Sequence, residues 1–230
     1  MYPVICKIGP FTVYSYGLML VVAFFVSTAL AAQKAKKQNI NPDIIFNFSF
    51  IVFISGVIGS RIFYVIENLG YYVKNPLEII MLQHGGLSWF GGLLMGSLMG
   101  TIYLKNKKLA VYKTLDLVIP FVALGQAIGR IGCLLNGCCF GKTLIPIQTY
   151  SSLILIFIFM ALRFLQDGAH KDGEIFFTYI LLYSIKRFFT EFWRMDNAIL
   201  LFGLTLFQLI SIVLFCFSLL KLSLLLKSKR

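Results

Sequence analysis

The sequence TLDLVIPFVALGQAIGRIGCLL, residues 114–135, is apolar and about as long as a helix that crosses a lipid bilayer. It nevertheless contains Arg130. A second unusual run, GGLSWFGG at 85–92, places four glycines at the start of another apolar segment. A cation at membrane depth costs about 3 kcal/mol on insertion scales. We therefore expect Arg130 to have a compensating partner, and an anionic ligand is the obvious candidate.

The rest of the chain has the composition of a polytopic membrane protein. Of its 230 residues, 59% are hydrophobic and 13% are charged, whereas soluble domains are about 45–50% apolar and about 25% charged. Apolar runs of nearly bilayer-spanning length cover residues 13–33, 44–66, 88–104, 114–135, 148–166, 173–191 and 204–226. We expect an all-α membrane protein with seven transmembrane helices, forming a single polytopic domain over residues 1–230.

The distribution of Lys and Arg predicts the orientation of these spans. Most cations fall in segments that seven crossings would place on one side: Lys34, Lys36, Lys37, Lys105, Lys107, Lys108, Lys113, Arg163, Lys171, Lys221, Lys227, Lys229 and Arg230. The other side has only Lys7, Lys74, Lys142 and Arg194. The positive-inside rule then puts the N-terminus outside and the C-terminus in the cytoplasm. The net charge of +12 forms no basic face, which argues against nucleic-acid binding.

The N-terminal residues carry no Lys/Arg-rich segment and no small-residue cleavage site before the first span. We therefore expect this span to be retained and not removed as a signal peptide.

Four cations remain within or at the ends of the second, fourth and sixth spans: Arg61, Arg130, Lys186 and Arg187. These spans run outward, so the arginines are expected in the outer half of the membrane. A guanidinium presents a planar fork of donors that suits phosphate oxygens. We expect Arg130 and Arg187 to bind one lipid phosphate, with Arg61 as a more distant cation. The alternative is structural: glycines permit close helix packing, and arginines at helix ends snorkel.

Further polar residues are expected near the same depth. Glycine-rich turns bring backbone N–H groups close to an anion. The side chains expected there are Tyr16, Asn136, Gln148, Tyr150, Tyr183, Lys186 and Glu191. Helical spacing puts Tyr183, Arg187 and Glu191 on one side of a helix, where Glu191 can pair with Arg187 or act in catalysis. The tyrosines can equally be interfacial anchors.

His84 directly precedes Gly85, and its ordinary pKa suits a general base, although an exposed loop residue is an equal alternative. Cys133, Cys138 and Cys139 lack a fourth ligand and a nearby His, so we expect no metal site. We interpret these cysteines as small apolar residues at a helix end. The alternative is that the thiols of Cys138 and Cys139 carry a transient acyl or glyceryl group.

In their order along the chain, these motifs resemble the prolipoprotein diacylglyceryl transferase family. The resemblance rests on Gly9-Pro10, Tyr16-Gly17-Leu18-Met19, Gly59-Ser60-Arg61, Gly85 to Gly92, Gly129-Arg130 through Asn136-Gly137 to Gly141, Pro146 with Gln148 and Tyr150, and Tyr183 with Arg187, Glu191 and Arg194. It runs over nearly the whole chain.

The resemblance implies an enzyme that moves the diacylglyceryl group of phosphatidylglycerol onto the thiol of a prelipoprotein lipobox cysteine, releasing glycerol phosphate. It implies catalytic roles for Arg130, Arg187 and Tyr16. His84 lies six residues before the position of the family's histidine and is a candidate base by its own chemistry. It implies substrate-binding roles for Arg61, Gly85, Gly86, Ser88, Gly91, Gly92, Gly129, Asn136, Gly141, Gln148, Tyr150, Tyr183 and Glu191. The expected location is the bacterial inner membrane, with the site toward the outer leaflet. No metal or organic cofactor is implied.

The chain departs from the family pattern at several positions. The histidine of the family's GG-[LM]-S-F-H-GG motif is Phe90 here, and the first Asn and the Glu of its signature are Cys133 and Cys138. Ile145, Ile147 and Ser151 replace three residues of its H-P-S-Q-L-Y-E motif, and the outer segment 141–146 is short. Two alternatives therefore stay open: a phospholipid-using transferase with another acceptor, and a non-catalytic protein that binds anionic lipid.

Overall fold

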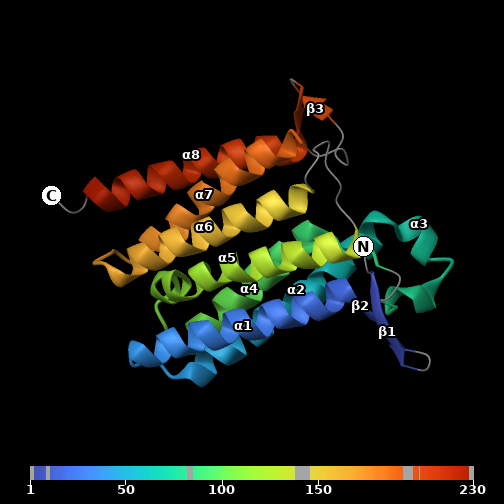
Figure 1. Ribbon diagram of the computed structural model, residues 1–230, viewed down its shortest axis with the longest axis horizontal. Coiled ribbons are helices and arrows are strands. Elements are labelled where there is room, and N and C mark those ends of the chain that lie inside the picture. The colour runs from blue at the N-terminus through green and yellow to red at the C-terminus, as the bar shows by residue number, and fades with distance from the viewer. Residues whose placement is uncertain are drawn as a thin grey trace. The chain divides into compact units, whose positions relative to one another are not determined.

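The computed structural model describes residues 3–8, 11–81, 85–137, 146–193, 199–201 and 203–227. The long helices are α1 (Ser15–Lys37), α2 (Pro42–Glu67), α4 (Trp89–Asn106), α5 (Val111–Asn136), α6 (Ile147–Asp167), α7 (Glu174–Glu191) and α8 (Leu206–Lys227) (Figure 1). Shorter elements are β1 (Val4–Ile8), β2 (Phe11–Tyr14), α3 (Leu69–Tyr72), the 3-10 helix η1 (Pro76–Ile79), β3 (Ile199–Leu201) and β4 (Leu204–Thr205). The strands form two antiparallel hairpins, β1–β2 and β3–β4. The expected helical fold is confirmed.

Each of the seven expected spans contains one long helix, and five of these helices are long and apolar enough to cross a membrane: α1, α2, α5, α6 and α8. The other two, α4 and α7, are less apolar over their length. The glycines of α4 and its terminal Lys105 lower its hydropathy, and α7 carries Glu174, Lys186, Arg187 and Glu191. The protein is therefore an integral membrane protein by its helices, whereas the count of seven spans stays a prediction.

The chain divides into two units, one of residues 1–31 and 112–230 and one of residues 32–111. In the second unit, α2 and α4 pack antiparallel through glycines. A Cβ added to Gly96 would lie 3.3 Å from the carbonyl oxygen of Val52, and one added to Gly91 would lie 2.6 Å from the Cβ of Phe63. Any side chain at Gly91 would push the helices apart. Close backbone approach explains why α4 begins with so many glycines.

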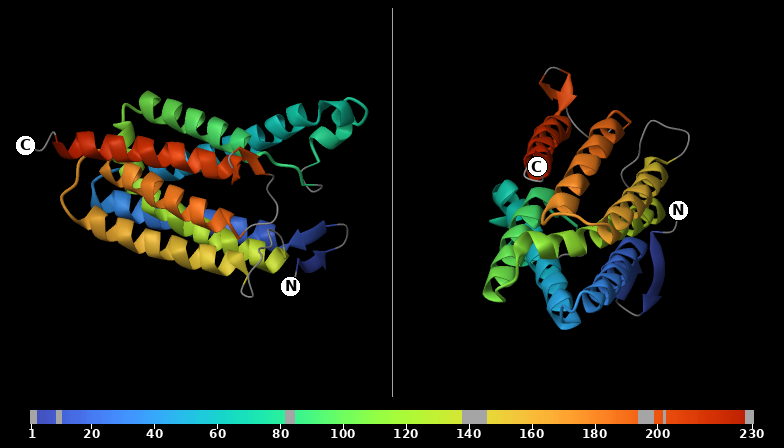
Figure 2. Two further views of the ribbon diagram at one scale, coloured as in Figure 1. Left: turned by 90° about the horizontal axis from the view of Figure 1, so that it is seen from above. Right: turned by 90° about the vertical axis from the view of Figure 1, so that its left-hand side faces the viewer.

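In the first unit, α6, α7 and α8 lie side by side in chain order (Figure 2). The apolar core lies between α5, α6 and α7 and includes the fully buried Ala123, Leu162 and Ile175. Ser152 on α6 donates its hydroxyl to the carbonyl oxygen of Ala127 on α5 at 2.9 Å, which ties the two helices together. Gly125 and Gly132 of α5 pack against α1, because a Cβ on Gly125 would lie 2.7 Å from Oγ of Ser27 and one on Gly132 would lie 2.8 Å from the Cβ of Met19.

The start of α7 is held by an acidic side chain from α5. Asp116 is buried, and its carboxylate accepts the backbone N–H of Gly173 at 2.5 Å and that of Phe176 at 2.7 Å. These N–H groups lie at the first turn of α7, where no intrahelical acceptor exists. The carboxylate therefore caps α7 and fixes it beside α5 at the end remote from Arg130.

Candidate anion-binding site

Arg130 lies near the end of α5, one residue after Gly129. It is partly buried, and its guanidinium forms no hydrogen bond or ion pair with another described residue. A Cβ on Gly129 would meet nothing within 4 Å, so the backbone beside Arg130 borders open space. A partly buried guanidinium next to open space can accept an anionic ligand at little steric cost.

A hydrogen bond between α5 and α7 indicates how far apart Arg130 and Arg187 lie along the two helix axes. The hydroxyl of Tyr179 donates to Oε1 of Gln126 at 2.8 Å. Arg130 lies one turn beyond Gln126, and Arg187 lies two turns beyond Tyr179. Because α5 and α7 run parallel and each helical turn of four residues rises about 6 Å, the two arginines differ in level by about one turn. Their long side chains extend from neighbouring helices of the same unit.

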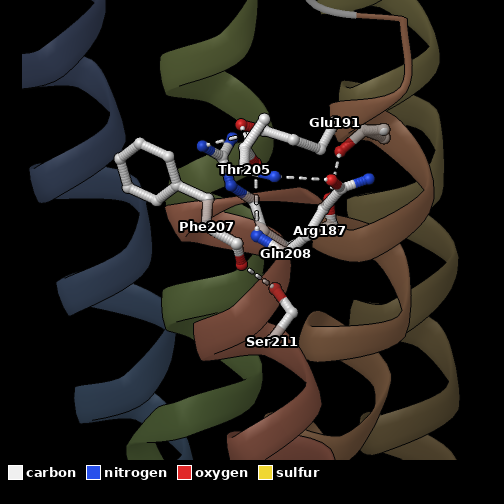
Figure 3. Close-up of polar contacts among 7 residues, drawn as sticks. Arg187, Glu191, Thr205, Phe207, Gln208 and Ser211 are labelled. Carbon is white, nitrogen blue, oxygen red and sulfur yellow. Dashed lines mark hydrogen bonds and ion pairs between the residues drawn. The ribbon is translucent and has the colours of Figure 1, made fainter. Parts of the chain in front are cut away.

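Arg187 is held from both sides (Figure 3). Its Nη2 lies 3.1 Å from Oε2 of Glu191 one turn later, so the expected ion pair is confirmed. The guanidinium carbon lies 4.5 Å from the centre of the Phe207 ring on α8. The Glu191 carboxylate is itself buried and accepts the hydroxyl of Thr205 at 3.1 Å. The guanidinium therefore has a fixed orientation and keeps 14% of its side chain exposed.

Two tyrosines of the expected site lie on α7 and α1. Tyr183, one turn before Arg187, has the Lys186 ammonium 5.3 Å from its ring centre. Tyr16, at the start of α1, lies against α5, because a Cβ on Gly132 would lie 3.5 Å from its ring. Tyr16 is 39% exposed, so its ring lines a surface near the Arg130 end of α5.

The start of α6 carries two more predicted site residues. Gln148 is almost fully buried in its first turn, and Tyr150 is exposed. Asn136 is the last residue of α5, and Gly137 follows it with φ +70°, a conformation that suits glycine. Asn136 therefore lies at the same end of α5 as Gly132, against which Tyr16 packs.

In the second unit, the guanidinium of Arg61 donates hydrogen bonds to backbone carbonyl oxygens. Its Nε donates to the carbonyl oxygen of Ile79 at 2.9 Å, and Nη1 donates to those of Gly85 and Gly86 at 2.5 and 2.9 Å. Nη2 donates to the carbonyl oxygens of Glu78 and Met81 at 2.5 and 3.2 Å. These bonds use all five N–H groups of the guanidinium. Arg61 can therefore act on a phosphate only through its charge.

Gly85 and Gly86 adopt φ of +78° and +81° and line a cavity of about 480 Å³. Its other walls are Tyr64, Asn68, Tyr71, Tyr72 and Glu78. The Tyr71 hydroxyl donates to Oε2 of Glu78 at 2.9 Å, and this bond together with the negative charge raises the pKa of Tyr71.

The other residues of the glycine motif have structural contacts. The Ser88 hydroxyl donates to Oε1 of Glu67 at 3.1 Å, and the Ser88 N–H donates to the carbonyl oxygen of Ser60 at 3.0 Å. Gly91 and Gly92 face α2, where a Cβ on Gly92 would lie 3.2 Å from the carbonyl oxygen of Gly56. The substrate-binding roles expected of Ser88, Gly91 and Gly92 stay predictions.

His84, Gly141, Cys138 and Cys139 lie outside the described residues. The predictions that rest on them, including the general base, therefore stay predictions. Within the ranges that the structure describes, no three His, Cys, Asp or Glu side chains form a group that could hold a metal ion.

Sequence reasoning missed Gln126, Tyr179, Thr205 and Gln208. Thr205 and Gln208 had a readable signal, because Thr-x-x-Gln before an apolar run is a capping box. Gln126 lies one turn before Arg130 on the same helix face, which also could have singled it out. Tyr179 had no such signal.

The chain is similar to proteins of a known family. A family model described as prolipoprotein diacylglyceryl transferase matches residues 3–224. Proteins named phosphatidylglycerol–prolipoprotein diacylglyceryl transferase are among its relatives. The Clostridium tetani protein is 32% identical over 216 residues, 85% of this chain and 86% of that protein. The Streptococcus pyogenes protein is 33% identical over 235 residues, 92% and 90% of the two chains. The Fusobacterium nucleatum protein is 46% identical over 139 residues, 60% of this chain and 48% of that protein.

Proposed function

Because this chain belongs to the prolipoprotein diacylglyceryl transferase family, we propose that it transfers the diacylglyceryl group of phosphatidylglycerol to the lipobox cysteine of prelipoproteins. The cysteine sulfur attacks the glyceryl carbon that bears the phosphate. A carbon–sulfur bond forms as the carbon–oxygen bond breaks, and its electron pair leaves with glycerol phosphate. The thiol proton passes to a base, for which His84 is the proposed residue.

The environment of Arg130 is the single observation that supports this proposal best. It is partly buried in an apolar helix and forms no hydrogen bond or ion pair with another described residue. A charge in such a place costs free energy unless a ligand compensates for it. The phosphate of an anionic lipid supplies that compensation.

The two arginines have separate tasks in this mechanism. Arg187, already oriented by Glu191 at 3.1 Å, directs its positive charge toward the phosphate. Arg130 supplies the charge that Glu191 does not neutralise. Both stabilise the phosphate oxygen that gains charge as the carbon–oxygen bond breaks, which is where electrostatic catalysis acts most strongly. Tyr16 and Tyr183 orient the lipid or the leaving group.

The membrane arrangement is part of the proposal. We place seven spans in one polytopic domain of the bacterial inner membrane, with the N-terminus outside, the C-terminus in the cytoplasm and the site toward the outer leaflet. The loop cations of the sequence support this orientation. The names of the relatives do not favour another acceptor or a non-catalytic lipid-binding role.

The test uses the purified full chain in phosphatidylglycerol vesicles with a synthetic lipobox peptide. The expected products are a peptide with a thioether-linked diacylglyceryl group, identified by mass, and an equal amount of glycerol phosphate. Arg130→Ala should abolish both, and Lys74→Ala, which removes an exposed cation, should not. A fully active Arg130→Ala variant would overturn the assignment of the anion site.

A further inference from the structure

The Arg187–Glu191 pair has contacts with Thr205, the last residue of β4, and with Phe207, in the first turn of α8 (Figure 3). The hydroxyl of Thr205 donates to Oε1 of Glu191 at 3.1 Å. Two residues later, the Phe207 ring lies 4.5 Å from the guanidinium carbon of Arg187. Glu191 and Gln208 are 3% and 2% exposed, so solvent does not compete for these contacts.

Thr205 and Gln208 also form a capping box. Oε1 of Gln208 accepts the N–H of Thr205 at 2.9 Å, and the Thr205 hydroxyl oxygen accepts the N–H of Gln208 at 3.3 Å. This reciprocal arrangement satisfies two N–H groups at a helix start. Because the hydroxyl accepts from Gln208, its single proton remains for Glu191.

The chain of contacts therefore runs from the capping box to the anion site. The backbone N–H of residue 208, which any side chain there would retain, holds the hydroxyl oxygen of Thr205. The hydroxyl in turn holds the carboxylate of Glu191, and the carboxylate holds the guanidinium of Arg187 at 3.1 Å. A buried carboxylate with a second fixed donor has fewer orientations than one that contacts the arginine alone. Its partner guanidinium is then held before the ligand arrives.

We propose that Thr205 is a positioning residue for Arg187, acting through Glu191. It has no contact with the lipid phosphate. Its hydroxyl keeps the carboxylate in the rotamer that aims Arg187 at the departing phosphate oxygen. This inference rests on the proposed transferase function, since it assigns a direction to the same arginine. It adds Thr205, the last residue of β4, to the residues that shape the site.

The chain offers variants that separate positioning from helix capping. Thr205→Val keeps the shape and removes the hydroxyl, whereas Thr205→Ser keeps the hydroxyl. Gln208→Leu removes the acceptor for the Thr205 N–H but leaves the Thr205–Glu191 bond. Ser218→Ala is a matched control, because Ser218 is a fully buried hydroxyl of α8 that bonds only within the helix, to the carbonyl oxygen of Phe215 at 3.0 Å.

The measurement is kcat and KM for phosphatidylglycerol in the vesicle assay, with melting temperatures of all variants. Misplacing a catalytic group by about 1 Å costs up to about a hundredfold in rate. We expect Thr205→Val to lower kcat on the order of tenfold with a smaller change in KM, because the departing phosphate oxygen carries more charge in the transition state than in the bound lipid. Thr205→Ser should restore kcat, and Gln208→Leu and Ser218→Ala should keep it within about twofold of the original chain.

A double-mutant cycle tests whether Thr205 acts through Glu191. In the Glu191→Ala background, Thr205→Val should lower kcat no further. An equal tenfold loss in that background would overturn the inference, as would an unchanged kcat in Thr205→Val alone. An equal loss of kcat in Gln208→Leu would assign the effect to capping and would also overturn it.

Failure of the proposed function gives a different result. If the unsubstituted chain makes no thioether product, binding of short-chain phosphatidylglycerol in detergent still reports on Arg187. The inference then requires weaker lipid binding by Thr205→Val and restored binding by Thr205→Ser. Equal binding by these variants and the original chain would overturn the positioning role independently of the reaction.

Discussion

Arg61→Ala is expected to lower the local stability of the backbone around η1 while leaving the first unit unchanged. The guanidinium donates five hydrogen bonds to the carbonyl oxygens of Glu78, Ile79, Met81, Gly85 and Gly86. A hydrogen bond to a charged group contributes about 1.5–3 kcal/mol. The sum of five overestimates the effect, because most of these residues are exposed and their carbonyl groups regain water.

The net loss of local stability is therefore about 3 kcal/mol, the equivalent of one or two charge-assisted bonds. Since 1.4 kcal/mol is a factor of ten in an equilibrium constant, local opening should become roughly a hundredfold more frequent. Amide hydrogen exchange measures it directly. The Glu78 N–H, bonded to the carbonyl oxygen of Asn75 at 3.1 Å, and the Met81 N–H, bonded to that of Glu78 at 3.2 Å, are the reporters.

Two further variants provide an intermediate case and a control for this experiment. Arg61→Lys offers at most three donors, so the exchange of these amides should lie between that of the original chain and that of Arg61→Ala. Lys74→Ala removes an exposed cation from the same segment and should leave exchange unchanged. If Arg61→Ala exchanges no faster than Lys74→Ala, the five bonds do not hold this segment and the reasoning is wrong.

Other regions give further expected outcomes. Gly91→Ala should lower the stability of the α2–α4 pair by about 1–3 kcal/mol, because its Cβ would lie 2.6 Å from that of Phe63. Gly17→Ala, whose Cβ meets nothing within 4 Å, should not lower it; melting temperatures in detergent measure both. Asp116→Ala should cost about 1–3 kcal/mol by leaving two N–H groups of α7 without an acceptor. Asp116→Asn should cost less in the same melting experiment, since one oxygen remains.

A pH titration tests the contact that raises the pKa of Tyr71. Because the hydrogen bond to Glu78 and its charge favour the neutral phenol, the Tyr71 tyrosinate should form at higher pH than that of a free tyrosine. Glu78→Gln should shift the titration to lower pH, as followed by the ultraviolet absorbance that Tyr71→Phe removes. An unchanged titration curve in Glu78→Gln would contradict the contact.

Helical periodicity predicted the local part of the site. The Arg187–Glu191 pair follows from a four-residue spacing, because such residues lie one above the other on a helix, and the structure confirms it at 3.1 Å. The seven apolar runs likewise predicted the seven long helices, because apolar length is a property of consecutive residues. Both predictions needed no knowledge of how distant segments pack.

Contacts between distant segments escaped sequence reasoning. Arg61 was expected to serve a ligand, but its acceptors are backbone carbonyl oxygens 17 to 25 residues away. Backbone acceptors exist at every residue and leave no signature in the sequence. Gly91 was expected either to admit a ligand or to permit close helix packing, and the structure places α2 against it, while its substrate-binding role stays a prediction. A glycine predicts close approach without indicating what approaches.

Complementation tests the central claim most directly. The chain is expressed in cells depleted of their own diacylglyceryl transferase, and the gel mobility of one lipobox-containing preprotein is followed. The proposed function predicts restored modification that Arg130→Ala abolishes and Lys74→Ala retains, with all proteins inserted in equal amounts. No modification by correctly inserted protein, or full modification by Arg130→Ala, would contradict it.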